Sequence, residues 1–399
     1  MPTYQTGRNI LVAYKSEGAT FNVAPAAAGA TRFRPNPSPG LNLAKAEIPP
    51  GEIRSDGQTS MVRYGSKSVA GGYVADISVG TFDSLLEAAL RGTWTAAVAI
   101  TQATMTSITT GANTIVAAAG SWITQGVRVG DVVRLTLHST AANNNRNLRV
   151  TGVTALTITV AETLTVDAVA DATFTLTVSK KLFQAATPVR RSFTFEEYDA
   201  DVDLTEQVTG ARVSSLKISG QPDGMCIVEF GIVGADLTPL GTGASPFFTA
   251  PTLSTSSALT LVDATIRYAG ADIATLTSFE VMLDLTAKTL PVIGSTVTPD
   301  VFENPAAMSG SISGVRSDFT NLTRFTAETE LELHVLMVQP EAEPKGFISA
   351  FLPRIKLGGV GKSFGGDGAM IETMPFRVGP KEATTGYDNT MIMLATSAP

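Results

Sequence analysis

The sequence predicts a mainly β protein in which one β unit occurs twice and a second, smaller β unit interrupts the first copy. Short β-branched runs broken by Gly and Asn dominate the chain. Three segments from the first 234 residues recur in the same order after residue 282. The expected fold class is therefore two duplicated β-sandwich or barrel domains, each with a short helix, plus an inserted small β-barrel or Ig-like domain.

The composition limits the classes of protein that the chain can belong to. Its 399 residues are enough for two or three domains. Charged residues make up only 16%, below the roughly 25% of ordinary soluble domains, which indicates either a small free surface or a surface largely buried against partners. The net charge of -7 argues against a protein that grips nucleic acid, which needs a basic surface. The single cysteine, Cys226, excludes an intramolecular disulfide and suits a buried strand position.

The first part of the chain contains a β-prone run at 9–15, an irregular Pro- and Gly-rich arm at 18–40, and the clearest helix at 81–91. We expect Thr81 to cap the start of this helix and Gly92 its end. Its apolar side chains fall on one stripe, typical of core packing: Phe82, Leu85, Leu86, Ala89 and Leu90.

The block 96–180 has a different character. It contains no lysine before Lys180, and its many threonines lie in short β-branched runs separated by Gly and Asn. Strands joined by such short turns indicate a small barrel or sandwich.

The duplication rests on three ordered matches within the chain. They pair 41–49 with 283–291, 70–79 with 308–317, and 216–234 with 355–379. The last pair contains the hairpin signals Asp223-Gly224 and Asp367-Gly368. The first copy is the longer one, and the block 96–180 lies inside the extra length. The expected domains are 1–95 and 181–250 (first copy), 96–180 (insert) and 251–399 (second copy).

Three N-terminal stretches carry a family resemblance: GRNILVAYKSEG at 7–18, SPGLNLAKAEIPPGEIRSDG at 38–57 and VGTFDSLLEAALRGTW at 79–94. They resemble the beginning of siphophage tail tube (major tail) proteins, the tube subunits of bacteriophages with long non-contractile tails. EIRSDG at 52–57 is the most telling piece. The resemblance is good over about residues 5–95 and fair over 185–399.

The resemblance implies a structural protein of the virion, made in the host cytoplasm, which assembles with itself. Each domain of the family contributes a long hairpin to an inner barrel, and stacked rings form the conduit for DNA ejection. Two copies per chain imply a ring of three subunits that imitates a hexamer, with a hexamer as the alternative. Further implied partners are the tape measure protein and the tail terminator. DNA would pass without specific binding, and no membrane partner or cofactor is expected.

The alternating segment 279–288 is a candidate for the channel wall. One set of its side chains is apolar and the other mostly polar, as in a strand with one buried face. An acidic or neutral wall would repel phosphate, whereas a basic wall would retain it. These side chains could equally face bulk water. The candidate lumen-facing residues on this segment and its matched partner 41–47 are Asn42, Ala44, Glu280, Asp284 and Lys288.

The loops 50–67 and 292–307 bridge the matched strands and are too long for tight turns. In the family such loops reach the neighbouring ring, although an ordinary mobile loop is the alternative. Charge pairs there would mainly fix register. The candidate ring-stacking residues are Glu52, Arg54, Asp56, Arg63 and Lys67.

Motifs for catalysis or metal binding are weak. His138 and His334 stand alone in β-like surroundings, and Gly361-Lys362-Ser363 lacks the preceding glycine that a phosphate-binding loop needs. We therefore expect no catalytic, cofactor or metal site. Two alternatives stay open: another phage or cell-surface β protein, such as a baseplate component or adhesin, and a tail depolymerase using the neighbouring carboxylates Glu196 and Glu197.

Overall fold

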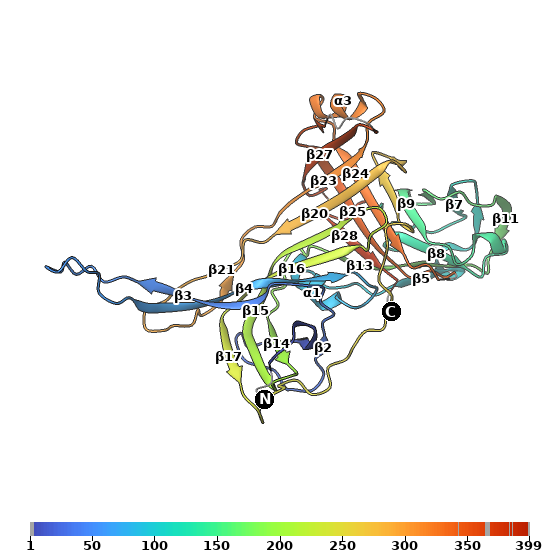
Figure 1. Ribbon diagram of the computed structural model, residues 1–399. Helices are drawn as coiled ribbons and strands as arrows, with labels where there is room; N and C mark the ends of the chain where they lie inside the picture. The colour runs from blue at the N-terminus through green and yellow to red at the C-terminus, as the bar shows by residue number, and fades with distance from the viewer. Residues whose placement is uncertain (1–3, 342, 364–367, 383, 385, 398–399) are drawn as a thin grey trace.

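The computed structural model describes residues 4–397 apart from 342, 364–367, 383 and 385. The chain is mainly β, with antiparallel sheets and a few short helices (Figure 1). The largest sheet has 18 strands, and a separate sheet of eight strands lies within residues 98–178. Asp367 of the second predicted Asp-Gly turn lies outside the described residues.

A first set of elements surrounds the eight-stranded sheet in sequence. In this set β3 pairs with β4, β4 with β16, β16 with β15, β15 with β14, and β14 with β1. Its elements are η1 (Gly7–Asn9), β1 (Ile10–Ser16), β2 (Thr31–Arg32), β3 (Gly40–Ile48), β4 (Arg63–Asp76), α1 (Asp83–Leu90), β13 (Lys180–Phe183), β14 (Phe193–Asp199), β15 (Leu204–Gly220), β16 (Ile227–Gly234) and β17 (Asp236–Leu240).

A second set follows in the C-terminal part of the chain. Here β20 pairs with β23, β23 with β27, β27 with β25, β25 with β24, and β24 with β18. Its elements are β18 (Thr265–Tyr268), β19 (Ala271–Asp272), β20 (Leu276–Asp284), β21 (Lys288–Thr289), β22 (Val301–Phe302), β23 (Ala307–Val315), α3 (Thr320–Thr326), β24 (Leu331–Val338), β25 (Phe347–Leu357), β26 (Gly361–Lys362), β27 (Ile371–Val378) and β28 (Met393–Thr396).

One pairing joins the two sets. Strand β20 lies antiparallel beside β15, with Asp284 opposite Ser215 and Phe279 opposite Gly220. The strands β3, β4, β16, β15, β20, β23, β27 and β25 therefore form one continuous sheet. Its buried face and α1 share a single core, which includes Leu216 and Leu283.

The helix predicted at 81–91 is confirmed as α1, but both predicted caps are wrong. Phe82 is the N-cap, and its side chain has no group that could make a cap bond. The Thr81 hydroxyl, one residue earlier, bonds Ser78 instead, at 2.6 Å between the oxygens. At the other end Arg91, not Gly92, adopts the left-handed conformation, with φ 52°. The apolar stripe of the helix is buried as expected.

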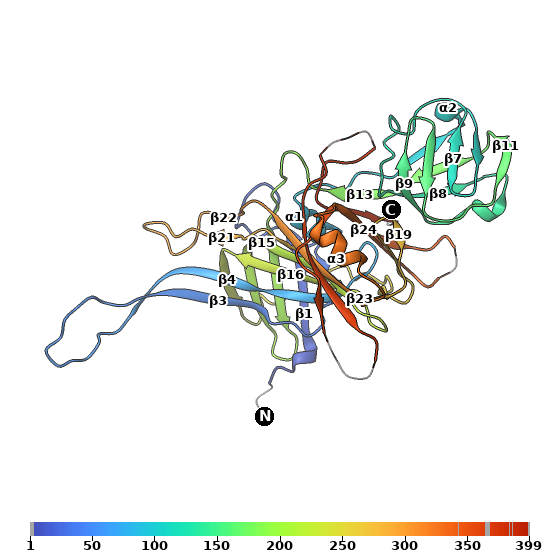
Figure 2. The same ribbon diagram turned by 90° about the horizontal axis from the view of Figure 1, so that it is seen from above.

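The eight-stranded sheet forms its own lobe around the buried Trp122 (Figure 2). Its strand order is β11-β6-β7-β10-β9-β8-β12-β5. The elements are β5 (Val98–Thr101), α2 (Gln102–Met105), β6 (Ile108–Thr110), β7 (Thr114–Ala117), β8 (Val132–Thr136), η2 (Ala141–Asn143), β9 (Leu148–Val153), β10 (Thr157–Val160), β11 (Asp167–Asp171) and β12 (Thr175–Val178).

This lobe packs against the second set of strands. Val132 lies in a small apolar cluster with Leu336 and Phe347, and Val129 packs with Phe351 and Met393 in another. Burial of these side chains stabilises the contact by roughly 25 cal/mol for each Å² of apolar surface removed from water. The lobe is therefore docked on the body rather than tethered to it by a flexible linker.

A buried ion network lies where the lobe leaves the body. Lys181 on β13 contacts Asp131 at 3.1 Å and Asp388 at 3.0 Å between nitrogen and oxygen. The backbone N–H of Arg128 also donates to Asp131, at 2.7 Å. Burial raises the pKa of Asp131 to about 6, although the Lys181 charge opposes the shift. The network connects the lobe, its exit strand and the C-terminal segment.

The raised pKa of Asp131 gives a pH-dependent prediction. Between pH 4 and 6 the unfolded state, with an ordinary carboxyl pKa near 4, loses its proton first. The contribution of Asp131 to stability should therefore fall as pH rises through this window, by on the order of 1–3 kcal/mol. Asp131→Asn should remove that fall in unfolding experiments from pH 4 to 7, whereas Asp56→Asn in an exposed loop should not. Equal slopes for Asp131→Asn and the wild type would contradict the assignment.

Candidate functional site

The continuous sheet has one face turned away from the core. On β15 and β20, Leu216 and Leu283 are buried, whereas the alternate residues Lys217, Glu280 and Met282 are partly or well exposed. The same alternation continues into β16 and β23. The outward-facing side chains therefore form a second, polar face across both sets of strands.

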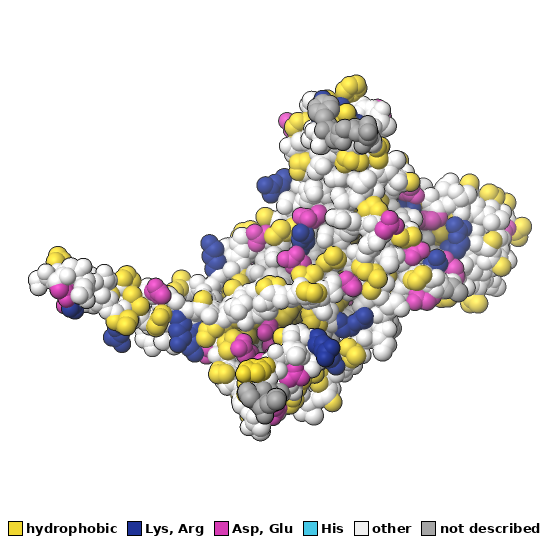
Figure 3. Space-filling model, viewed as in Figure 1, with side chains coloured by type: hydrophobic (Ala, Val, Ile, Leu, Met, Phe, Trp, Pro, Cys, Tyr) yellow, Lys and Arg dark blue, Asp and Glu magenta, His cyan; other side chains and the backbone are white. Residues whose placement is uncertain are grey.

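Small residues dominate this polar face. Gly40, Gly72 and Gly231 lie in one row across β3, β4 and β16, and that row continues through Ser215 to Asp284. Ser309 and Ser311 on β23 lie opposite Met282 and Glu280. Few large side chains therefore project from this face. On the side of the molecule seen in Figure 3, areas without charged side chains separate the charged groups.

Charges of both signs lie on the polar face. Lys217 and Glu280 form an ion pair at 3.0 Å, and Glu229 lies opposite Lys217 on the neighbouring strand. Farther along the sheet Arg377 lies opposite Lys356. The face is thus mixed, and the acidic character expected from Glu280 and Asp284 is partly offset.

Four of the five candidate lumen residues lie on the polar face, and the fifth, Lys288, lies in a separate two-stranded ladder. Asn42 and Ala44 are exposed on β3, and by strand alternation they share the polar face with Glu280 and Asp284. The predicted alternation to Lys288 is wrong, because β20 ends at Asp284 and Thr286 adopts φ 43°. Lys288 instead lies opposite Phe302 in the β21–β22 ladder.

The hairpin of β3 and β4 projects from the body as a long arm that ends in the loop 49–62 (Figures 1 and 2). Two of the five ring-stacking candidates do not lie in the loop, since Arg63 and Lys67 belong to β4. Lys67 pairs with Asp236 of the same chain at 2.8 Å.

The charges within the loop also find partners in the same chain. Arg54 pairs with Asp56 at 2.6 Å, and Ser60 donates to Glu52, also at 2.6 Å. Neither contact requires a neighbouring subunit. Because such exposed pairs contribute little stability, they remain available for exchange with outside partners.

Apolar side chains at the hairpin tips were missed by the sequence analysis. Ile53 is 99% exposed and Met61 88% in the first tip, and Ile293 is fully exposed in the second, the loop 290–300. Exposed apolar groups clustered at loop tips mark interaction surfaces. The sequence contains both isoleucines, in EIRSDG (52–57) and PVIG (291–294), but only the charged residues of these loops were considered.

A cluster of three arginines and two carboxylates fixes the base of the second hairpin. Asp300 contacts Arg190 at 3.0 Å and Arg212 at 2.8 Å. Glu303, which is largely buried, lies within 4.0 Å of both and of Arg91. Burial raises the Glu303 pKa, and these arginine charges oppose the shift. The cluster ties the second hairpin to elements of the first set.

The paired carboxylates of β14 make structural contacts. Glu196 accepts hydrogen bonds from the backbone N–H groups of Phe247 and Phe248, at 2.6 and 2.9 Å. Glu197 accepts from the Tyr73 hydroxyl and from the Leu41 N–H. Neighbouring strand residues point to opposite sides, so the two carboxylates do not converge on one substrate.

Other reactive groups are buried and shielded. Burial raises the pKa of the Cys226 thiol to about 12 and lowers that of His334 to about 3. Among the described residues, no group of three or more His, Cys, Asp or Glu side chains is placed to hold a metal. Nor does the described part of the chain contain a helix long and apolar enough to cross a membrane.

Two glycines in neighbouring strands provide a matched test of the arm. A Cβ at Gly71 would clash with the Gly40 carbonyl oxygen, which is rigid backbone, whereas at Gly231 it would meet only the side chains of Ser214 and Ser215. Gly71→Ala should therefore destabilise the protein by about 1–3 kcal/mol and loosen the arm, measured by thermal unfolding and limited proteolysis. Gly231→Ala should stay within about 0.5 kcal/mol. A larger loss for Gly231→Ala than for Gly71→Ala would contradict this packing.

Comparison with known proteins identifies a protein family that matches most of the chain. The family model for phage tail tube proteins matches residues 7–378. The match spans the continuous sheet, both hairpins and the docked lobe. No curated protein matches the chain.

Proposed function

The chain belongs to the phage tail tube protein family, and we propose that three copies close each ring of the tube. It is a structural component of the virion that forms the tail tube, and it is not an enzyme. We extend the proposal to the long, non-contractile tail of a siphophage. The observation that carries the trimer is the continuous sheet, which in the described part of the chain leaves one edge of β3 and the last residues of β25, on the β24 side, without a strand beside them.

We propose that the two sets of strands are copies of one tube unit. Supporting this, the pairing sequence β3-β4-β16-β15-β14-β1 has the counterpart β20-β23-β27-β25-β24-β18. Leu41 and Leu283 take equivalent places, opposite Gly71 and Met308. The corresponding domains are 1–95 with 181–250, the insert 96–180, and 251–399.

The free edges make the two ends of the sheet complementary. Within the described residues, β3 pairs with β4 alone, so one edge of β3 has no strand beside it. At the other end β24 accompanies β25 only as far as Ile355, and β27 occupies the opposite side. The equivalent position on β15 is filled by β20. Edge strands left open in this way are templates for pairing with another chain.

Equivalence between the units sets the register of the contact between protomers. Inside the chain Asp284 lies opposite Ser215. The match of 41–49 with 283–291 makes Asn42 the counterpart of Asp284. The row of paired residues that starts two residues before Asn42 ends at Ser215, and the row that starts two residues before Asp284 ends at Lys356, so Lys356 is the counterpart of Ser215. Asn42 of one protomer should then lie opposite Lys356 of the next. Three chains supply six such units, which favours the trimer over the alternative hexamer.

The polar face would line the lumen of this ring. Glycine and serine rows leave a shallow wall, and mixed charges give phosphate no basic track to follow. DNA could then pass without specific binding. The tape measure protein and the tail terminator complete the proposed set of partners. The loop 49–62, with Glu52, Arg54 and Asp56, is proposed to reach the adjacent ring.

Disulfide trapping tests the ring register. Asn42→Cys with Lys356→Cys should give covalent trimers after mild oxidation, because directly opposed strand residues bring their Cβ atoms to about 4.5–5.5 Å. Denaturing gels would measure the product, and the buried Cys226 should not compete. Ala46→Cys with Lys356→Cys, on the same face but four residues along β3, is the matched control. Rings that form but give no trimer with the first pair would refute this register.

Charge reversal tests the assignment of the lumen. Glu280→Lys with Asp284→Lys should leave ring and tube formation intact but slow DNA release severalfold, because the wall would then attract phosphate. Ejection kinetics of virions carrying the variant would report the effect. Glu280→Gln with Asp284→Asn is the neutral control and should eject like the wild type. Unchanged ejection by the lysine variant would mean that β20 does not face the channel.

A further inference from the structure

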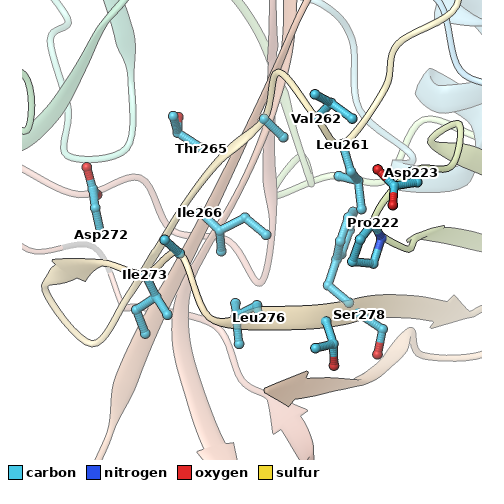
Figure 4. A pocket seen from close by; sticks show the side chains of 14 residues that line it. Pro222, Asp223, Leu261, Val262, Thr265, Ile266, Asp272, Ile273, Leu276 and Ser278 are labelled. Atoms are coloured by element: carbon cyan, nitrogen blue, oxygen red, sulfur yellow. The ribbon is translucent and has the colours of Figure 1, made fainter. Parts of the chain in front are cut away.

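A pocket lies at the start of β20, at the end of this strand that is remote from the β21–β22 hairpin. The segment 261–266 crosses in front of this strand, and the turn after β15 closes one side (Figure 4). The pocket has a volume of about 510 Å³. Its apolar lining includes Pro222, Leu261, Val262, Ile266, Ile273 and Leu276.

Charge contributes little to this pocket. Its ionisable residues are Asp223 in the turn and Asp272 on β19. Asp272 is already paired with Arg149 of the docked lobe at 2.7 Å, and with Arg267 at 3.4 Å. Val262 at the rim is 70% exposed although it is apolar. An occupant of this pocket should therefore be apolar and uncharged.

The second hairpin carries a tip with those properties. Residues 290–299 contain no ionisable side chain. Leu290, Val292 and the fully exposed Ile293 present apolar surface to solvent. The tip is held in place, since the N–H of Lys67 donates to the Thr296 carbonyl at 2.7 Å and the arginine cluster fixes its base. A preorganised apolar tip loses little entropy on binding.

Strand β20 relates the pocket to the tip. It begins beside the pocket at Leu276 and ends at Asp284, beyond which the chain enters the β21–β22 hairpin. Tip and pocket thus lie at opposite ends of one strand. Copies stacked head to tail would bring the tip of one towards the pocket of the next, a heterologous contact that repeats without closing.

We propose that Ile293 of one ring inserts into this pocket on a second copy of the chain in the adjacent ring. The inference rests on the proposed ring and names the contact that stacks it. Apolar insertion, rather than charge pairing at the first loop, then supplies the main attraction between rings. The contact joins the second tube unit of one ring to the matching unit of the next.

Substitution at the tip separates stacking from ring closure. Ile293→Asp should form rings, because Ile293 is fully exposed and belongs to neither β3 nor β25, but should fail to extend them into tubes in electron micrographs. Val262→Asp at the pocket rim should have the same effect, and Ile293→Leu should still form tubes. Tubes of normal length from Ile293→Asp would overturn the inference while leaving the ring proposal intact. A wild type that forms neither rings nor tubes would overturn the ring proposal and this inference together.

Cross-linking tests the same contact directly. Ile293→Cys with Val262→Cys, oxidised in assembled tubes, should give a ladder of covalent multimers on denaturing gels. Ile293→Cys with Val169→Cys, an exposed position on the lobe, is the matched control and should give none. Tubes of the first variant without such a ladder would place Ile293 elsewhere and overturn the inference.

Discussion

The pairing of β15 with β20 is the constraint on which the rest of the structure depends. It runs from Ser215 opposite Asp284 to Gly220 opposite Phe279, and it places Leu216 beside Leu283 in the shared core. Without it the two sets of strands would be separate sheets with separate faces. With it, one polar face spans both sets; within the described residues β3 has one edge without a strand at one end, and β25 extends past β24 at the other.

Local signals in the sequence predicted local features correctly. The apolar stripe of 81–91 predicted α1, and Asp223-Gly224 predicted the turn after β15, where Asp223 adopts φ 58°. Caps and strand ends were not predictable in the same way, because tertiary partners decide them. The Thr81 hydroxyl bonds Ser78 and donates to the distant Ser254 rather than to the helix, and β20 stops where Thr286 turns left-handed.

Strand alternation in the sequence was enough to group residues on the polar face, whereas the exposed apolar residues at the hairpin tips were missed. Asn42 and Glu280 were assigned to one polar face from a period of two residues, which pairing preserves across a sheet. Ile53 and Ile293 gave no such signal. An isoleucine in a loop is as compatible with burial as with exposure, and only the folded chain reveals that both side chains are exposed. Charged residues such as Lys67 drew attention although they pair within the chain.

The docked lobe has a mechanical consequence. It is held at its root, where Lys181 joins Asp131 to Asp388, and again across the apolar contacts of Val132 and Val129 with the body. Ion pairs and apolar packing around residues 129–132 together remove the swivel that a flexible linker would allow. Cargo fused to the outer end of the lobe would therefore keep one orientation relative to the sheet. A filament of such chains would display that cargo as a regular array.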